Sequence, residues 1–248
     1  MYGIASADGY EICLVSMRTY GHELVEERED AISFMSPGTL RAKDRRLDML
    51  NVKYVVTTAY APDFDEFAAD GRFSLVFHKY AVAVFENKSV LPRAFVVPVS
   101  GMEVLPRVED KLARLKDASF DPRKSVLLSE IPTSLTSGRS ERPAPIFSTE
   151  TEILESGPNR LGLRTHNFGP GILVVSQTFY PGWTATVDGR KADVFAANIA
   201  LTGIAVPAGI HDVQLQFRPL SFRIGAALTL MSLLIFGILI LARNSKAA

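Results

Sequence analysis

The stretch HDVQLQFRPLSFRIGAALTLMSLLIFGILILA, residues 211–242, decides how the rest of the chain is interpreted. Its first part alternates apolar and polar side chains, the pattern of a β-strand with one buried face. Its last 19 residues, 224–242, carry no charge. A helix of that length rises roughly 28 Å, close to the thickness of the hydrocarbon layer of a bilayer. We therefore expect a sheet that leads within a few residues into a transmembrane helix.

The charges that flank this segment do not fix its orientation. Arg218 and Arg223 precede it, and Arg243 and Lys246 follow it, so the positive-inside rule has no asymmetry to act on. The N-terminus lacks a basic region followed by a continuous apolar region, so we expect no secretory signal. A free-standing chain of this kind is expected to keep its bulk in the cytoplasm, whereas the end of a multi-span protein can have its bulk outside.

Composition excludes several classes of function. The 248 residues contain 27 Lys and Arg against 27 Asp and Glu. This balance argues against a highly charged disordered chain and against a generally basic protein that binds nucleic acid. The single cysteine, Cys13, excludes an internal disulfide and any metal site built from several cysteines.

The pattern upstream of the apolar segment predicts two parts. Strand-forming runs and one amphipathic helix from Val108 alternate in the first part, with a loop expected at Pro62 and Asp63. The second part has short alternating runs separated by turn signals every 8 to 12 residues, of which Asp188-Gly189 is the clearest hairpin turn.

The expected fold class is an α+β N-terminal part followed by an antiparallel β-sandwich and one C-terminal transmembrane helix. The boundaries are 1–131 for the α+β part, 132–147 for a linker rich in Pro, Ser and Gly, 148–219 for the sandwich and 224–242 for the transmembrane helix.

A search for catalytic motifs finds none that is complete. His22 and Glu26 would share one face of a helix, but a zinc protease motif needs a histidine at the fifth place. The tripeptide Asn87-Lys88-Ser89 matches a glycosylation sequon, which matters only in a secretory pathway. We expect no catalytic residue, no metal site and no cofactor in this chain.

Aromatic residues flank the turn at Pro181 and Gly182. Tyr180 and Trp183 could stack on the face of a sugar ring if their rings are exposed. A single tryptophan in a small sandwich is more often part of the core. Both interpretations of Trp183 remain open at the sequence level.

Several segments, in this order, resemble YfhO-like bacterial membrane proteins. They are YGIASADGYE (2–11), LDMLNVKYVVT (47–57), VFENKSVLPRAFVV (84–97), FYPGWTATVDG (179–189) and VPAGIHDVQLQFRPLSF (206–222). The sequence departs from the family pattern at Glu11, where the family tends to have aspartate. Residues 104–147 carry little that resembles the family.

This resemblance implies a function for a larger parent protein. YfhO-like proteins are similar to polytopic glycosyltransferases of the GT-C type, which take a sugar from a polyprenyl-phosphate carrier outside the bacterial cytoplasmic membrane and glycosylate envelope polymers. In such enzymes the catalytic carboxylate lies in an early external loop, to which nothing here corresponds. The resemblance therefore implies an extracytoplasmic C-terminal module, from a truncated or split gene, that is not catalytic by itself.

The expected role of this module is to position the acceptor or to cap the active-site vestibule. Candidate contacts for a substrate are Tyr180, Trp183, Asn198 and Arg93, for each of which a packing or turn role is the alternative. The expected partners are the lipid bilayer and, through the parent protein, the sugar donor and the polymer acceptor, with no nucleic acid. Two rivals stay open: a membrane-anchored envelope scaffold that binds carbohydrate or protein without catalysis, and a tail-anchored cytoplasmic protein.

Overall fold

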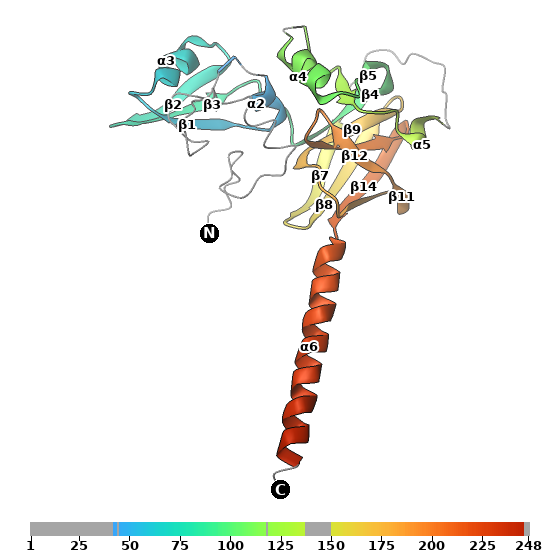
Figure 1. Cartoon of the computed structure of the whole chain (residues 1–248). Helices are drawn as coiled ribbons and strands as arrows, with labels where there is room; N and C mark the ends of the chain where they lie inside the picture. Colours follow the sequence, from blue (N-terminus) through green and yellow to red (C-terminus); the bar gives the residue numbers. More distant parts are fainter. Residues whose placement is uncertain (1–41, 44, 118, 137–149, 246–248) are drawn as a thin grey trace.

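The structure is a computed structural model that describes residues 42–43, 45–117, 119–136 and 150–245. Two lobes lie side by side and a long helix leaves the second (Figure 1). The expected helical pattern that contains His22 and Glu26, and residues 137–147 of the expected linker, lie outside the described residues. The expected fold class is confirmed: antiparallel sheets dominate, with a few helices and one apolar C-terminal helix.

The first lobe, residues 42–91, is a three-stranded antiparallel sheet covered on one face by a helix. Its spatial order is β1 (Tyr54–Thr58), β3 (Val82–Asn87), β2 (Phe73–Lys79). The inner residues of these strands pack on α3 (Pro62–Ala69), where the Phe67 ring meets the ring of Phe73 edge to face at 4.8 Å. A short helix, α2 (Arg46–Met49), precedes the sheet.

Helix α3 replaces the loop that the sequence predicts at Pro62 and Asp63. Pro62 occupies the start of this helix, where a missing N–H costs nothing and the fixed φ suits the first turn. Two acidic residues of the first turn, Asp63 and Asp65, lie at the positive end of the helix dipole. The prediction of a loop was wrong because a Pro-Asp pair is equally typical of a turn and of a helix start.

The second lobe contains two packed antiparallel sheets. One has the order β11-β10-β14-β8-β7 and the other the order β12-β13-β9-β4. The strands after residue 149 are β7 (Glu150–Gly157), β8 (Arg160–Asn167), β9 (Gly171–Thr178), β10 (Trp183–Val187), β11 (Arg190–Ala192), β12 (Val194–Ala197), β13 (Leu201–Val206) and β14 (Gly209–Phe217).

The second sheet also takes in β4 (Ala94–Pro98), which pairs antiparallel with β9 along its whole length. This strand lies before the expected linker, within the part expected at 1–131. Residues 148–219 therefore make up all but one strand of the sandwich. The chain returns to β9 only after about 70 residues, a pairing that local sequence pattern does not encode.

A third layer covers the outer face of the β12-β13-β9-β4 sheet. It is formed by the parallel pair β5 (Met102–Val104) and β6 (Val126–Leu128), the helix α4 (Val108–Lys116) between them, and the loop before β6. Leu115, Phe120 and Leu127 of this layer belong to one apolar core with Ile172 and Val174 of β9. Two short elements complete it: η1 (Val99–Gly101) and α5 (Thr133–Thr136).

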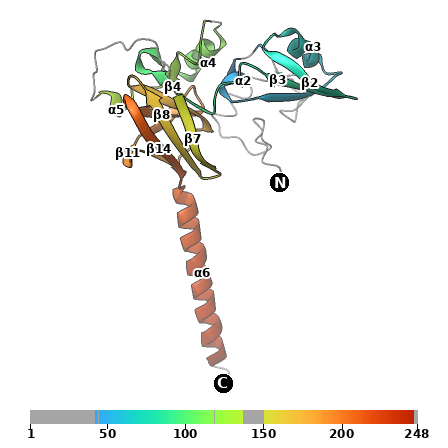
Figure 2. The same ribbon diagram turned by 180° about the vertical axis from the view of Figure 1, so that it is seen from behind.

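Helix α6 (Leu220–Ser245) stands away from both lobes in both views (Figures 1 and 2). Residues Leu220–Ile238 form a candidate membrane span of 19 residues, none of it buried against the rest of the protein. The helix starts four residues before the expected boundary at 224. Its hydroxyl groups at Thr229 and Ser232 donate to the carbonyl oxygens four residues earlier, both at 2.9 Å, so neither needs water as a partner.

Candidate functional site

The turn between β9 and β10 lies directly against the junction of β14 with α6. The rings of Tyr180 and Trp183 both face Phe217, the last residue of β14, with centroid distances of 6.1 Å and 5.2 Å. Register places them together, because Trp183 pairs with Phe217 across the ladder. The two aromatic candidates are therefore neighbours, joined by a third ring that the sequence analysis did not select.

Gly182 allows this close approach. Its φ of +120° is a conformation that side chains disfavour, and a Cβ at this position would lie 3.0 Å from the Phe217 ring and 3.1 Å from the Cα of Pro219. The N–H of Arg218 donates to the carbonyl oxygen of Gly182 at 2.7 Å. A backbone hydrogen bond therefore links the turn to the residues that lead into α6.

Trp183 is half-buried and packs on the apolar core between the two sheets. Tyr180 is more accessible, with 40% of its surface exposed. Trp183 therefore packs on the core, as one interpretation of the sequence expects, and it also keeps some exposed surface. A sugar contact at that surface stays a prediction.

Asn198 lies in the interior with none of its surface exposed. Its φ of 47° is left-handed, a conformation that asparagine tolerates better than most residues. Its side-chain oxygen accepts from the N–H of Leu127 and its own N–H donates to the carbonyl of Leu127, both at 2.9 Å. Asn198 thus attaches β6 to the sandwich by two hydrogen bonds, and its amide nitrogen lies 3.7 Å from the sulfur of Met49.

Arg93 lies just before β4, apart from these residues. Its guanidinium donates to the hydroxyl of Ser156 on β7 at 2.8 Å, and its carbonyl accepts from the N–H of Ser176 on β9. It therefore joins the edges of the two sheets. Of the four predicted substrate contacts, the structure brings Tyr180 and Trp183 together and places Asn198 and Arg93 elsewhere.

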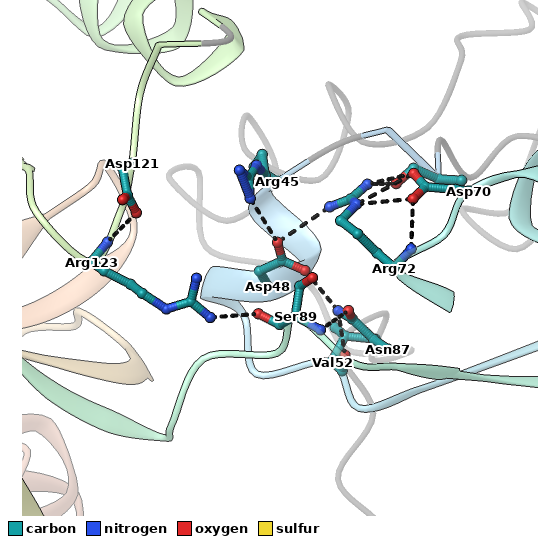
Figure 3. Close-up of polar contacts among 10 residues, drawn as sticks. Arg45, Asp48, Val52, Asp70, Arg72, Asn87, Ser89, Asp121 and Arg123 are labelled. Atoms are coloured by element: carbon teal, nitrogen blue, oxygen red, sulfur yellow. Dashed lines mark hydrogen bonds and ion pairs between the residues drawn. The ribbon is translucent and has the colours of Figure 1, made fainter. Parts of the chain in front are cut away.

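A buried polar cluster in the first lobe surrounds Asp48 (Figure 3). Asp48 is 2% exposed and its carboxylate accepts from Arg72 at 3.2 Å and from Asn87 at 2.8 Å. Arg72 also donates to Asp70. Burial raises the pKa of Asp70, but the hydrogen bonds and the charge of Arg72 outweigh this effect and hold that pKa below its usual value. Spacings of 24 and 39 residues hid this cluster from sequence analysis.

Asn87, the first residue of the sequon, is a member of this cluster. It is 1% exposed, and its amide nitrogen donates to Asp48 and to the carbonyl of Val52 at 3.1 Å. Its side-chain oxygen accepts from the N–H of Ser89. In the folded chain the nitrogen that a glycan would need is buried and engaged, so Asn87 supports the fold of this lobe.

A second polar cluster lies on the sandwich, at the hairpin turn that the sequence predicts. Asp188 has φ 50° and Gly189 has φ +76°, which confirms the expected turn. One ring nitrogen of His211 lies 2.6 Å from the Asp188 carboxylate, and the other lies 3.0 Å from the carbonyl of Ala208. Asp212, beside it, forms a two-pronged ion pair with Arg164.

These contacts shift the protonation of His211. Burial alone lowers the pKa of its imidazole, but the hydrogen bonds to Asp188 and Ala208 and the charge of Asp188 together raise it above its usual value. The hydrogen bond to His211 lowers the pKa of Asp188. The pair is a structural contact at the turn. No group of three or more His, Cys, Asp or Glu side chains that could hold a metal ion occurs among the described residues.

Comparison with known protein families gives one match. Residues 151–229 match the family described as bacterial membrane protein YfhO, a range that runs from β7 through the sandwich into the first part of α6. Comparisons with curated proteins and with solved structures gave no match. Residues 151–229 are therefore similar to the YfhO family of bacterial membrane proteins.

Proposed function

We propose that this chain is the extracytoplasmic C-terminal module of a YfhO-like membrane glycosyltransferase that glycosylates cell-envelope polymers, and that the module positions substrate without catalysing transfer. The observation that carries the proposal is the junction: only Arg218 and Pro219 separate the last sandwich strand from the apolar helix. A sandwich attached in this way stays at the membrane surface, where a lipid-linked donor and a polymer acceptor would meet.

A contribution through position has a physical basis. Holding two reactants in a productive geometry lowers the entropic cost of their reaction, and a rigid scaffold does this without taking part in bond making. The backbone bond between Arg218 and Gly182 and the close packing at Gly182 support such rigidity. Tyr180 is the candidate best placed for an acceptor, because it is exposed, whereas the buried Asn198 acts through packing.

Sidedness is tested by cysteine labelling in bacterial cells that produce the full-length parent, in a background with Cys13→Ser and any parent cysteines replaced. Lys124→Cys places a thiol at a site whose side chain is 82% exposed, in the loop before β6. Ser245→Cys places one at the other end of α6. A membrane-impermeant maleimide should label the cysteine at position 124 in intact cells and the one at position 245 only after lysis. The reverse pattern would refute the extracytoplasmic placement.

The lack of a reactive centre is tested on the isolated chain. Purified in detergent and supplied with a polyprenyl-phosphate sugar and an envelope polymer, it should transfer no sugar. Turnover by the isolated chain would refute the proposal. In the full-length parent, Tyr180→Ala should lower sugar transfer. Tyr80→Ala, which removes the same side chain at a residue 86% exposed in the first lobe, is the control and should not lower it.

A binding role without catalysis is the second candidate. The outer face of the first-lobe sheet carries exposed apolar side chains on its two outer strands, among them Tyr54 at 52% and Val56 at 69% exposure on β1 and Phe77 at 48% on β2. Exposed apolar surfaces of this kind are typical of protein contacts. If the parent transfers sugar normally after Val56→Asp and Phe77→Asp but the chain loses a protein partner, the binding role is favoured.

A further inference from the structure

Three aromatic rings gather at the base of the sandwich, where the chain enters α6. They are Tyr180, Trp183 and Phe217, and we refer to them as the aromatic collar. Phe217 lies at the centre, within 6.1 Å of both other rings measured between centroids. The helix begins three residues after Phe217, at Leu220, and Figure 1 shows it leaving the sandwich at this end.

The length of the span sets the depth of the collar. The charge-free run 224–242 rises roughly 28 Å and fills a hydrocarbon layer of about 30 Å. Leu220 and Pro219 then lie about 6 to 8 Å beyond that layer, at a rise of about 1.5 Å per residue. The headgroup layer on each side is about 5 to 8 Å thick. Because Gly182 packs against Pro219 and Phe217, the turn that carries the collar falls within this headgroup layer.

The chemistry of the surrounding side chains fits such a position. Tryptophan and tyrosine are enriched at the interface between water and lipid, where an apolar ring and a polar group are both satisfied. Arg218 and Arg223 are exposed on either side of the helix start, so their charges can meet lipid phosphates while their stems lie along apolar surface. Leu220 and Phe222, 65% and 74% exposed, continue the apolar surface toward the span.

The collar cannot move far from the helix start. The Arg218 N–H donates to the Gly182 carbonyl at 2.7 Å, and the Thr184 hydroxyl donates to the Gln216 carbonyl at 3.1 Å. Trp183 is also held by the core of the sandwich. The depth of the helix in the bilayer therefore sets the depth of the rings.

We propose that the aromatic collar binds the lipid headgroup layer and seats the base of the sandwich in the membrane interface. This proposal rests on α6 crossing a bilayer, which the proposed function shares. It does not depend on which side of the membrane the sandwich occupies or on sugar transfer.

Trp183 is the only tryptophan in the chain, so its fluorescence reports the position of the collar without any substitution. The full chain is reconstituted into vesicles of phosphatidylcholine and phosphatidylglycerol that contain a nitroxide-labelled lipid. The nitroxide is placed near the headgroup in one preparation and near the end of the acyl chain in another. Quenching by aqueous iodide is measured in a third.

Two variants calibrate the measurement, each combined with Trp183→Phe. Leu230→Trp places the probe in the middle of the span, and Tyr60→Trp places it at a residue 84% exposed in the first lobe. The first should be quenched most by the deep nitroxide and the second most by iodide. Flotation after an alkaline wash establishes that α6 is inserted in every sample.

With α6 inserted, Trp183 should lose most fluorescence to the nitroxide near the headgroup, less to the deep nitroxide, and less to iodide than the Tyr60→Trp probe loses. Equal insensitivity to both nitroxides would overturn the collar, as would stronger quenching by the deep one. A chain that fails to float would overturn the membrane placement itself. If the maleimide labels position 245 but not position 124 in intact cells, while Trp183 is quenched most by the nitroxide near the headgroup, the proposed function is refuted and the proposal of the aromatic collar stands.

Discussion

The sheet of the first lobe and the β12-β13-β9-β4 sheet of the sandwich differ in how many of their faces are covered. In β9, Ile172 and Val174 face one core while Leu173 and Val175 face the other, and all four have no exposed surface. In β1, Val55 is buried but its neighbours Tyr54 and Val56 are 52% and 69% exposed. The β12-β13-β9-β4 sheet is thus covered on both faces by described residues, whereas the sheet of the first lobe presents an apolar face to its surroundings.

The two lobes also differ in what holds them together. The sandwich relies on apolar packing on both sides of its central sheet. The buried apolar residues of the first lobe continue into the core between the third layer and β9, and the first lobe adds the buried network of Asp48, Arg72 and Asn87. A contact from Arg123 in the third layer to the carbonyl of Ser89 at 3.3 Å ties the lobes at their boundary (Figure 3). The contrast predicts that polar changes harm the first lobe most and apolar truncations harm the sandwich most.

The largest effect is expected from Asp48→Ala. Removing this carboxylate takes one buried acceptor from the Arg72 guanidinium and one from the Asn87 amide, which keep only Asp70, Val52 and other backbone carbonyls as acceptors. The cost should be about 3 kcal/mol in unfolding free energy. The exposed pair of Arg107 and Glu109, each with a side chain 73% exposed, supplies the control, because Glu109→Ala should cost less than about 1 kcal/mol. Denaturant unfolding with hydrogen exchange along β1 and β3 measures both. Equal losses of unfolding free energy in Asp48→Ala and Glu109→Ala would contradict the claim that the buried polar network stabilises the first lobe.

Leu173→Ala should have an effect of similar size. It truncates a side chain with no exposed surface in the core of the sandwich, and the cavity should cost about 2 to 5 kcal/mol. Val56→Ala truncates a strand residue on the open face of the first lobe and should change stability by about 0.5 kcal/mol or less. Thermal unfolding in detergent compares the two. A large loss from Val56→Ala would mean that its face is covered in the folded chain.

Glycine substitutions test the third layer. A Cβ at Gly101 would lie 1.8 Å from the carbonyl oxygen of Lys124, so Gly101→Ala must shift the backbone and should cost about 1 to 3 kcal/mol. Gly71 has nothing within 4 Å of an added Cβ, so Gly71→Ala should be neutral or stabilising by up to about 1 kcal/mol. Hydrogen exchange at β5 and β6 should rise only in the first variant. Unchanged stability of Gly101→Ala would show that the third layer packs less closely.

The smallest effect concerns the hairpin of the sandwich. Because the folded-state pKa of His211 lies above its usual 6.5, the stability it contributes is complete below pH 6.5 and is lost as pH rises through the folded-state pKa. The pKa of Asp188 is lowered, so its own contribution is present above pH 3.8 and is lost as pH falls through the folded-state value.

Asp188→Asn should therefore lower the pKa of His211, as measured by an NMR titration of its ring. Asp193→Asn, directly after β11 and hydrogen-bonded to Thr133, is the matched control and should leave the titration of His211 unchanged. An unshifted His211 in the Asp188 variant would show that the ring does not depend on this carboxylate.

The sequence pattern predicted the elements of this fold well where the apolar side chains follow a single regular spacing. The alternation of Val213, Leu215 and Phe217 against two glutamines identifies β14, and Asp188-Gly189 identifies the turn of the hairpin formed by β10 and β11. The continuous apolar run in β9 follows from a sheet buried on both faces. Pattern could not show that β4 completes that sheet, because long-range pairing leaves no periodic signal.

The candidate site was predictable only in part for the same reason. Tyr180 and Trp183 stand out in the sequence as aromatics around a Pro-Gly turn. Phe217, which joins them, is 34 residues beyond Trp183 and looks like any other strand residue. Asn198 attracts notice as a polar residue, yet its left-handed φ and its bonds to Leu127 make it a packing residue. Burial and register are needed to separate these cases.

The central claim is that a YfhO-like sandwich is anchored to a bilayer through α6. The direct measurement is fractionation of bacterial cells that produce the chain, followed by an alkaline wash of the membranes. The account predicts that the chain stays with the membranes and needs detergent for release, while Leu230→Arg combined with Leu234→Arg, two charges in the middle of the span, weakens this retention. Recovery of the unaltered chain as a folded protein in the detergent-free soluble fraction would contradict it.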